Sequence, residues 1–311
     1  SVPSGLLHFG TLYFWRVRYQ DGSLNWSPWS NATSFTTISS PDSPENIVCV
    51  STSSQLLSAL NAATVNNKAD VIRLVQGQYE GNFVANAQDN KNISIEGGYT
   101  AGCAALTSDP TKTVIDGRNA GRVLAFDFSA SSLYGDITIS NLTIRGGTGA
   151  NGGGLYAKVR EGSVLLAGSI FENNVSTGVE GGGGAYLEGL TTTAAVTVAD
   201  SIFQNNTVTG NGCCGGALFI RTTGSVAVKN SMVNNNASPK RGGGLYVVAL
   251  AKALTLAGNT ISNNVTSLEG GGAYVYAAED DLTADNNNFL GNEVSGGEEN
   301  NLDFGFGGGL L

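Results

Sequence analysis

Short stretches in which apolar and polar residues alternate recur from residue 69 onward, separated by glycine or asparagine. Val196-Thr197-Val198 is one of them, and its period of two is that of a β-strand. These stretches are accompanied by a motif of two glycines, then Leu or Ala, then Tyr or Leu. The motif recurs at residues 153–156, 183–186, 215–218, 243–246, 271–274 and 308–311, with spacings of 30, 32, 28, 28 and 37 residues. This spacing predicts a repeat protein built from short strands.

A second motif, an apolar residue followed three positions later by asparagine, keeps the same period. Because Gly-Gly pairs and β-branched alternation disfavour helices, the two motifs predict an all-β fold, specifically a parallel β-helix. One inward column of this coil is predicted to contain Phe171, Phe203 and Phe289, together with Val233 and Ile261. The next turn is predicted to hold a ladder of side-chain amides from Asn174, Asn206, Asn236, Asn264 and Asn292.

Residues 54–63 follow a helical pattern instead. Leu56, Leu57 and Leu60 recur at helical spacing after Ser53-Ser54, which predicts a short amphipathic helix. The uncovered end of a β-helix is an open sheet edge. We therefore expect this helix to cap the first coil of a domain that spans residues 49–311 and continues beyond residue 311.

Residues 1–37 are predicted to form a separate two-stranded hairpin. Tyr13-Phe14-Trp15-Arg16-Val17 alternates in strand fashion, and the turn signal Asp21-Gly22 and the segment Trp26-Ser27-Pro28-Trp29-Ser30 follow it. The guanidinium groups of Arg16 and Arg18 are expected to stack on Trp26 and Trp29. Residues 38–48, which contain Ser-Ser-Pro-Asp-Ser-Pro, form a linker to the main domain.

Composition and charge exclude several classes of protein. Gly accounts for 44 of 311 residues without a strict period of three, so the chain is rich in turns but is not collagen. The chain has 25 acidic and 16 basic residues, and nine acids but no bases follow Lys252, so residues 1–252 contain 16 of each. Without clustered bases, neither a nucleic acid nor an anionic membrane is an expected partner. No apolar run is long enough to span a membrane.

Two parts of the chain resemble known families. Tyr13-Phe14-Trp15-Arg16-Val17 and Trp26-Ser27-Pro28-Trp29-Ser30 are similar to the last two strands of a fibronectin type III domain. The glycine and Phe-x-x-Asn motifs resemble those of polymorphic outer membrane proteins. Residues 69–147, with Ile95-Glu96-Gly97-Gly98-Tyr99 and Val114-Ile115-Asp116-Gly117, resemble the opening coils of the pectate-lyase-like superfamily. The resemblance to the pectate-lyase-like superfamily implies a right-handed parallel β-helix.

The four cysteines leave two questions open. Cys49 enters the capping segment and Cys103 lies after the first coil, so a disulfide between them is predicted, with two buried free thiols as the alternative. Such a bridge implies an oxidising compartment, outside the cell or on its outer surface. For the adjacent pair Cys213-Cys214, two small residues filling a corner are favoured over a vicinal disulfide. No metal site is expected, and the acids from Glu279 to Asp303 are predicted to be a solvated face.

A row of tyrosines is the candidate binding surface. The residue after the Leu or Ala of each glycine motif is Tyr156, Tyr186, Leu218, Tyr246 or Tyr274. Lys158 and Glu188 lie two residues further along the same face and should not be buried unpaired, so the tyrosines are expected to face outward. Such a row could contact a glycan or a protein on a host or neighbouring cell, although Leu218 would interrupt it.

These features favour a non-catalytic secreted or surface-displayed bacterial protein without a cofactor, acting as an adhesin or as a stalk, fibre or filament subunit. Head-to-tail self-assembly is a further expectation. The alternative is a polysaccharide lyase or glycoside hydrolase of the pectate-lyase-like superfamily. No paired carboxylates or histidine shuttle stand out within the repeats, and Asp116, Arg118 and Arg122 lie in a turn.

Overall fold

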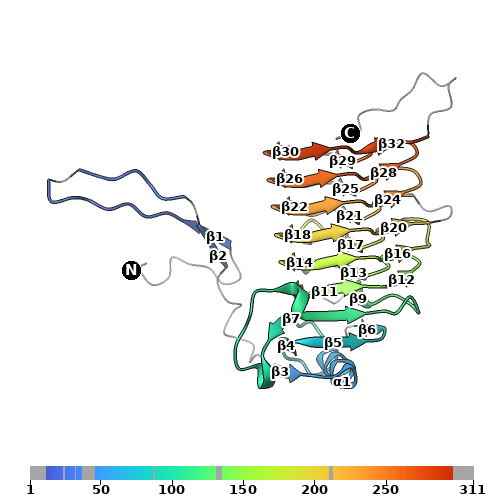
Figure 1. Ribbon diagram of the computed structural model, residues 1–311. Helices are drawn as coiled ribbons and strands as arrows, with labels where there is room; N and C mark the ends of the chain where they lie inside the picture. Colours follow the sequence, from blue (N-terminus) through green and yellow to red (C-terminus); the bar gives the residue numbers. More distant parts are fainter. Residues whose placement is uncertain are drawn as a thin grey trace. The chain divides into compact units, whose positions relative to one another are not determined.

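The computed structural model describes residues 12–23, 25–31, 33–36, 46–86, 88–130, 135–209 and 213–296 (Figure 1). The chain divides into two compact units, Ser1–Pro44 and Glu45–Leu311. The last glycine motif, at residues 308–311, lies outside the described residues.

The described part of the first unit is a hairpin. Strand β1 (Leu12–Trp15) pairs with β2 (Thr33–Thr36) in antiparallel fashion. The guanidinium carbon of Arg18 lies 4.2 Å from the ring centre of Trp26 and 4.4 Å from that of Trp29, and the guanidinium carbon of Arg16 lies 5.6 Å from Trp29. The predicted stacking of arginine on tryptophan is therefore present in this hairpin.

The second unit is a solenoid whose strands all run parallel, which confirms the predicted class of fold (Figure 1). The first sheet contains, in spatial order, β3 (Asn46–Val50), β4 (Asp70–Val75), β7 (Ile93–Tyr99), β10 (Ile137–Ser140), β14 (Val164–Ala167), β18 (Val196–Ala199), β22 (Val226–Lys229), β26 (Leu254–Ala257) and β30 (Leu282–Asp285). The second contains β5 (Gly77–Glu80), β8 (Thr113–Asp116), β11 (Thr143–Arg145), β15 (Ile170–Glu172), β19 (Ile202–Gln204), β23 (Met232–Asn234), β27 (Thr260–Ser262) and β31 (Asn288–Leu290).

Two further sheets complete each turn of the coil, which we call a rung. The third contains β12 (Thr148–Gly149), β16 (Val175–Ser176), β20 (Thr207–Val208), β24 (Ala237–Ser238), β28 (Val265–Thr266) and β32 (Glu293–Val294). The fourth contains β6 (Phe83–Asn86), β9 (Leu124–Phe128), β13 (Leu155–Val159), β17 (Ala185–Gly189), β21 (Leu218–Thr222), β25 (Leu245–Ala249) and β29 (Ala273–Ala277). Two short 3-10 helices, η1 (Ala101–Cys103) and η2 (Pro110–Lys112), lie in the loop between β7 and β8.

The core is made of columns of like side chains. Phe171 and Phe203 are fully buried and stack with their ring centres 4.7 Å apart and their planes at 4°. Val233 and Ile261 continue the column in the buried core, and Phe289 is partly buried against it. The column therefore follows the order predicted from the repeats.

A ladder of five asparagines, of which all but Asn292 are buried, turns the corner between the second and third sheets. The Nδ2 atom of each asparagine donates to the Oδ1 atom of the next at 2.9–3.1 Å, through Asn174, Asn206, Asn236, Asn264 and Asn292. The residue before the ladder position has positive φ in every one of these rungs: Asn173, Asn205, Asn235, Asn263 and Gly291. Asn and Gly are the residue types that adopt this conformation most readily, which explains the double asparagines of the sequence.

Helix α1 (Ser53–Ala63) begins after Thr52, whose side chain accepts the backbone N–H of Gln55. Leu56 and Leu60 are buried, whereas Leu57 is 43% exposed, so only two of the three leucines face inward. The helix contacts β3, β4, β5 and β6. A disulfide joins Cys49 in β3 to Cys103 in η1, with 5.8 Å between the Cα atoms. In the described part of the chain, no helix has the length and apolar character needed to cross a membrane.

Candidate functional site

The outer face of the fourth sheet carries a continuous column of aromatic rings. Tyr156, Tyr186, Phe219, Tyr246 and Tyr274 occupy equivalent positions on five neighbouring strands. Successive ring centres are 4.8–5.3 Å apart, and successive planes meet at 5–17°. The rings therefore stack face to face along the coil.

The sequence alignment of the third glycine motif was wrong by one residue. Leu218 pairs with Ala185 and Leu245 and points into the core, so the outward residue of that strand is Phe219. The cause is Ala217, which occupies the place that a third glycine holds in the neighbouring rungs, at Gly154 and Gly184. The aromatic column consequently has no interruption.

The expectation that the tyrosines are exposed is wrong for Tyr186. This side chain is 1% exposed and Phe219 is 4% exposed, because both form a small cluster with Cys214 outside the main core. Tyr156, Tyr246 and Tyr274 are half-buried. Since the ring faces contact one another, the column offers ring edges and hydroxyls to solvent rather than a flat stacking platform.

A second row of side chains runs beside the aromatic column. Asp127, Lys158, Glu188 and Arg221 occupy the outward position two residues further along their strands, so charges of opposite sign alternate from strand to strand. Glu188 is only 5% exposed, and its Oε2 atom lies 2.9 Å from Lys158 Nζ. Its Oε1 atom accepts hydrogen bonds from Arg221, with 3.2 Å to Nε and a shorter contact to Nη2.

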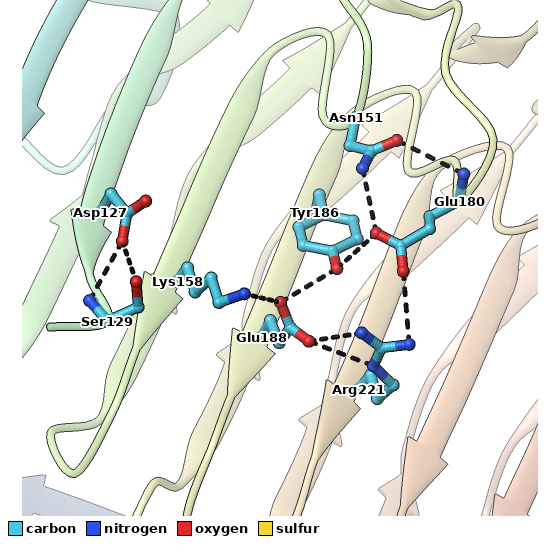
Figure 2. Close-up of polar contacts among 8 residues, drawn as sticks. All are labelled: Asp127, Ser129, Asn151, Lys158, Glu180, Tyr186, Glu188 and Arg221. Carbon is cyan, nitrogen blue, oxygen red and sulfur yellow. Dashed lines mark hydrogen bonds and ion pairs between the residues drawn. The ribbon is translucent and has the colours of Figure 1, made fainter. Parts of the chain in front are cut away.

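A closed ring of polar contacts includes the Tyr186 hydroxyl (Figure 2). The Tyr186 hydroxyl lies 2.8 Å from Glu180 Oε2 and 3.1 Å from Glu188 Oε2, so it bridges two carboxylates. Arg221 joins the same carboxylates, because its Nη1 atom lies 3.3 Å from Glu180 Oε1. Asn151 Nδ2 also donates to Glu180 Oε2 at 3.0 Å. Glu180 comes from the turn before β17 and was not identified from the sequence, because it belongs to no periodic strand pattern.

These contacts shift proton affinities away from those useful in acid–base catalysis. Burial alone would lower the pKa of Lys158, but its hydrogen bond and ion pair with Glu188 outweigh burial and raise it. Burial and hydrogen bonding to Glu180 raise the pKa of Tyr186 far above its ordinary value. A lysine that acts as a general base near neutral pH needs a lowered pKa. Lys158 therefore remains a protonated partner of Glu188, and the Tyr186 phenol remains neutral.

The turn residues noted in the sequence are also paired. Asp116 Oδ2 accepts from Arg145 Nε at 2.8 Å, and Arg118 Nη1 lies 2.6 Å from Glu80 Oε2. Arg122 lies with its guanidinium carbon 4.8 Å from the ring centre of Tyr156 and donates to nearby backbone carbonyls. Within the described ranges, no group of three or more His, Cys, Asp or Glu residues has the arrangement of a metal site.

Cys213 and Cys214 are joined to each other, whereas the sequence favoured two unbridged small residues. The described cysteines include no free thiol. Both disulfides thus lie in the solenoid unit, one beside α1 and one beside the aromatic column.

Comparison with known proteins gives a family. A family model described as "Right handed beta helix region" matches residues 125–302, and no curated protein matches the chain. Among solved structures, the chain is similar to an alginate lyase from Paenibacillus sp. str. FPU-7, with 15% sequence identity and a TM-score of 0.31 over 80% of this chain and 98% of that chain. A similarity this low carries no argument about function. The family match covers more than half of the chain, which therefore belongs to the right-handed β-helix family.

Proposed function

We propose that this protein is a non-catalytic, extended structural element that acts outside the cell or on its outer surface, as a stalk or spacer. One observation carries the proposal: the charged side chains Lys158, Glu188 and Arg221 on the outer face of the fourth sheet are bound to one another across neighbouring strands. Glu188 alone contacts Lys158, Tyr186 and Arg221, which come from its own strand and from the strands on both sides. Such contacts hold rungs together and keep Lys158 and Glu188 bound to each other rather than free to exchange protons with a substrate.

The internal columns support the same role. The stacked phenylalanines and the asparagine ladder join each rung mainly to its neighbours. In repeat proteins of this kind, the free energy of unfolding is the sum of the stability of each rung and of the contacts between neighbouring rungs. The number of rungs can therefore change without redesign of the core. We include in the proposal that α1 caps the coil, and that residues 1–37 derive from a fibronectin type III-like module, a common spacer unit.

The Cys49–Cys103 disulfide supports the extracellular location. Disulfides persist in oxidising compartments and are rare in the cytosol. The proposal further includes repeats of the polymorphic outer membrane protein type, which fit a surface-displayed coil.

Adhesion is the second candidate function, and it rests on the half-exposed edges and hydroxyls of Tyr156, Tyr246 and Tyr274. These rings flank the covered Tyr186 and Phe219, and Arg241 lies with its guanidinium carbon 5.3 Å from the ring centre of Tyr274. A glycan hydroxyl or a protein loop could hydrogen-bond to such an edge.

Removal of one whole rung tests the structural role. Leu245 and Ala273 occupy equivalent positions, so deletion of residues 245–272 joins Gly244 to Ala273 in register. We expect a folded protein with unchanged β-sheet circular dichroism and a coil shorter by about 4.8 Å, measured by small-angle X-ray scattering. A deletion of 14 residues within the same rung is the matched control and should fail to fold, because it breaks the register. Failure of the whole-rung variant to fold would count against a coil of freely adjustable length.

Two assays separate the other functions from the structural role. Incubation with alginate, pectate and related acidic polysaccharides should release no unsaturated product. Cleavage that disappears in Lys158→Ala would overturn the non-catalytic proposal. Binding to a glycan array or to cells that is lost when Tyr156, Tyr246 and Tyr274 are changed to Ala, without loss of fold, would favour adhesion.

A further inference from the structure

The two adjacent cysteines occupy the turn that leads into β21, beside the covered part of the aromatic column. Cys214 is fully buried against Tyr186 and Phe219, and Cys213 is partly buried against the same cluster. Cys214 belongs to a parallel series of isolated bridges that joins Gly181, Cys214, Arg241 and Glu269. We call residues 213–215 the cysteine turn and residues 178–182 the Glu180 turn.

Backbone hydrogen bonds join the cysteine turn to its neighbours on both sides. The N–H of Cys213 donates to Val179 O at 2.9 Å, and the N–H of Cys214 donates to Glu180 O at 3.1 Å. The N–H of Gly182 donates back to Cys214 O at 3.0 Å. On the other side, the N–H of Arg241 donates to Cys213 O at 3.2 Å. The peptide between the two cysteines is thus the centre of this network.

The Glu180 turn is bound to the hydroxyl of Tyr186. The Glu180 carboxylate lies 2.8 Å from the Tyr186 hydroxyl and 3.3 Å from Arg221 Nη1. The backbone carbonyl of the same Glu180 accepts the N–H of Cys214. The cysteine turn therefore holds the residue whose side chain binds the Tyr186 hydroxyl and Arg221.

We propose that the Cys213–Cys214 disulfide is a reduction-sensitive closure that keeps Tyr186 and Phe219 covered, and that a dithiol reductant opens it. In this step the S–S bond breaks and two S–H groups form. The reductant supplies two electrons and two protons, and its own two sulfurs join in a disulfide. One bond is replaced by two thiols that can no longer lie within bonding distance, and a close-packed site has no spare room for them.

The consequence is local. The cysteine turn shifts, the hydrogen bonds to Val179 and Glu180 weaken, and the Glu180 carboxylate leaves Tyr186 and Arg221. Tyr186 and Phe219 then become as accessible as their neighbours Tyr156 and Tyr246. The strands themselves stay paired, because their ladders and the core do not involve the cysteines.

Hydrogen-exchange mass spectrometry with and without dithiothreitol tests the proposal. In parallel samples, alkylation and peptide mapping identify which disulfide is open. On reduction of Cys213–Cys214, the amides of Gly182, Cys214 and Arg241 should exchange faster by about tenfold or more, whereas those of β9 should not change. The variant Cys49→Ser/Cys103→Ser should show the same faster exchange on reduction, which would show that the response does not come from the Cys49–Cys103 disulfide. In Cys213→Ser/Cys214→Ser, the amides of residues 182, 214 and 241 should exchange fast both with and without dithiothreitol.

Three results would overturn the proposal, and the wild-type chain alone gives two of them. One is a Cys213–Cys214 bond absent from the unreduced protein. Another is unchanged exchange at Gly182 and Cys214 after alkylation shows both thiols free. The third is slow exchange in Cys213→Ser/Cys214→Ser, equal to that of the oxidised wild type.

Discussion

Glu188 on β17 and Lys158 on β13 form an ion pair with 2.9 Å between Oε2 and Nζ, although Glu188 is almost completely buried. The pair is not isolated, because Arg221 on β21 binds the other carboxylate oxygen. A buried carboxylate flanked by cations on both neighbouring strands links three rungs on the outside of the coil. It also makes the stability of those rungs depend on pH.

We predict that Glu188→Gln destabilises the protein at neutral pH but not in strong acid. Burial alone would raise the pKa of Glu188, but the hydrogen bonds and charges of Arg221 and Lys158 outweigh it and lower the pKa. A carboxylate with a lowered folded-state pKa contributes stability above its unfolded pKa of about 4.3, and this stability is lost as pH falls through the folded value. The difference in unfolding free energy should be roughly 1–3 kcal/mol at pH 7 and close to zero near pH 2. Urea titrations across this range measure it, and exposed Glu279→Gln serves as the control.

Asn236→Ala should destabilise the coil by about 2–4 kcal/mol, because several buried groups lose partners at once. Asn236 Oδ1 accepts from the N–H and Nδ2 of Asn206 at 2.9 and 3.1 Å, and its own Nδ2 donates to Asn264 Oδ1 at 2.9 Å. Asn292→Ala, in a half-buried position of the same ladder, should cost less than half as much. Equal losses from both variants in denaturant titrations would contradict a cooperative ladder.

Phe203→Ala should cost about 3–5 kcal/mol, since it removes a fully buried ring from a column. Phe203→Leu keeps most of the volume and should cost less than about 1.5 kcal/mol. Phe289→Ala removes a ring that is only partly buried and should have a smaller effect than Phe203→Ala. Thermal unfolding followed by circular dichroism measures the order, and a larger effect at Phe289 would show that the column is not the main source of stability.

The two disulfides should differ in their effect on global stability. The Cys49–Cys103 bridge spans 54 residues, and its loss in Cys49→Ser/Cys103→Ser should lower the unfolding free energy by about 4 kcal/mol in the chain-entropy model. Cys213→Ser/Cys214→Ser is the matched control, because a bond between adjacent residues closes almost no loop. Similar losses from both double variants would mean that loop closure is not the cause.

The columns of the core could be predicted because each repeats one residue type at one spacing. Phe171 and Phe203, or Asn174 and Asn206, reveal their partnership by identity alone, and the structure places each pair in contact. The period then implies the parallel pairing. Helix α1 has a clear start in the sequence, but its apolar face could not be fixed from three leucines, and Leu57 faces solvent.

The outer face was harder to predict, because its contacts involve turns of unequal length. Ala217 stands where the neighbouring rungs have a glycine, and this shifted the alignment of the repeat by one residue. The outward position of that strand was therefore assigned to Leu218 instead of Phe219. The burial of Tyr186 depends on Glu180 and on the cysteine turn, neither of which follows the two-residue alternation of a strand. Alternation identifies which side chains leave the core, but it carries no information about what lies over them.

The asparagine ladder also gives the coil a direction. Each Nδ2 donates toward the following rung and each Oδ1 accepts from the preceding one, so the amide dipoles are aligned along the axis. The other hydrogen of each Nδ2 binds a backbone carbonyl of the preceding rung, as at Ile144, Phe171 and Phe203, so every amide of the ladder is tied to both of its neighbours. A further rung in the same orientation would continue this order of donors and acceptors, whereas a reversed rung would set one Nδ2 against another.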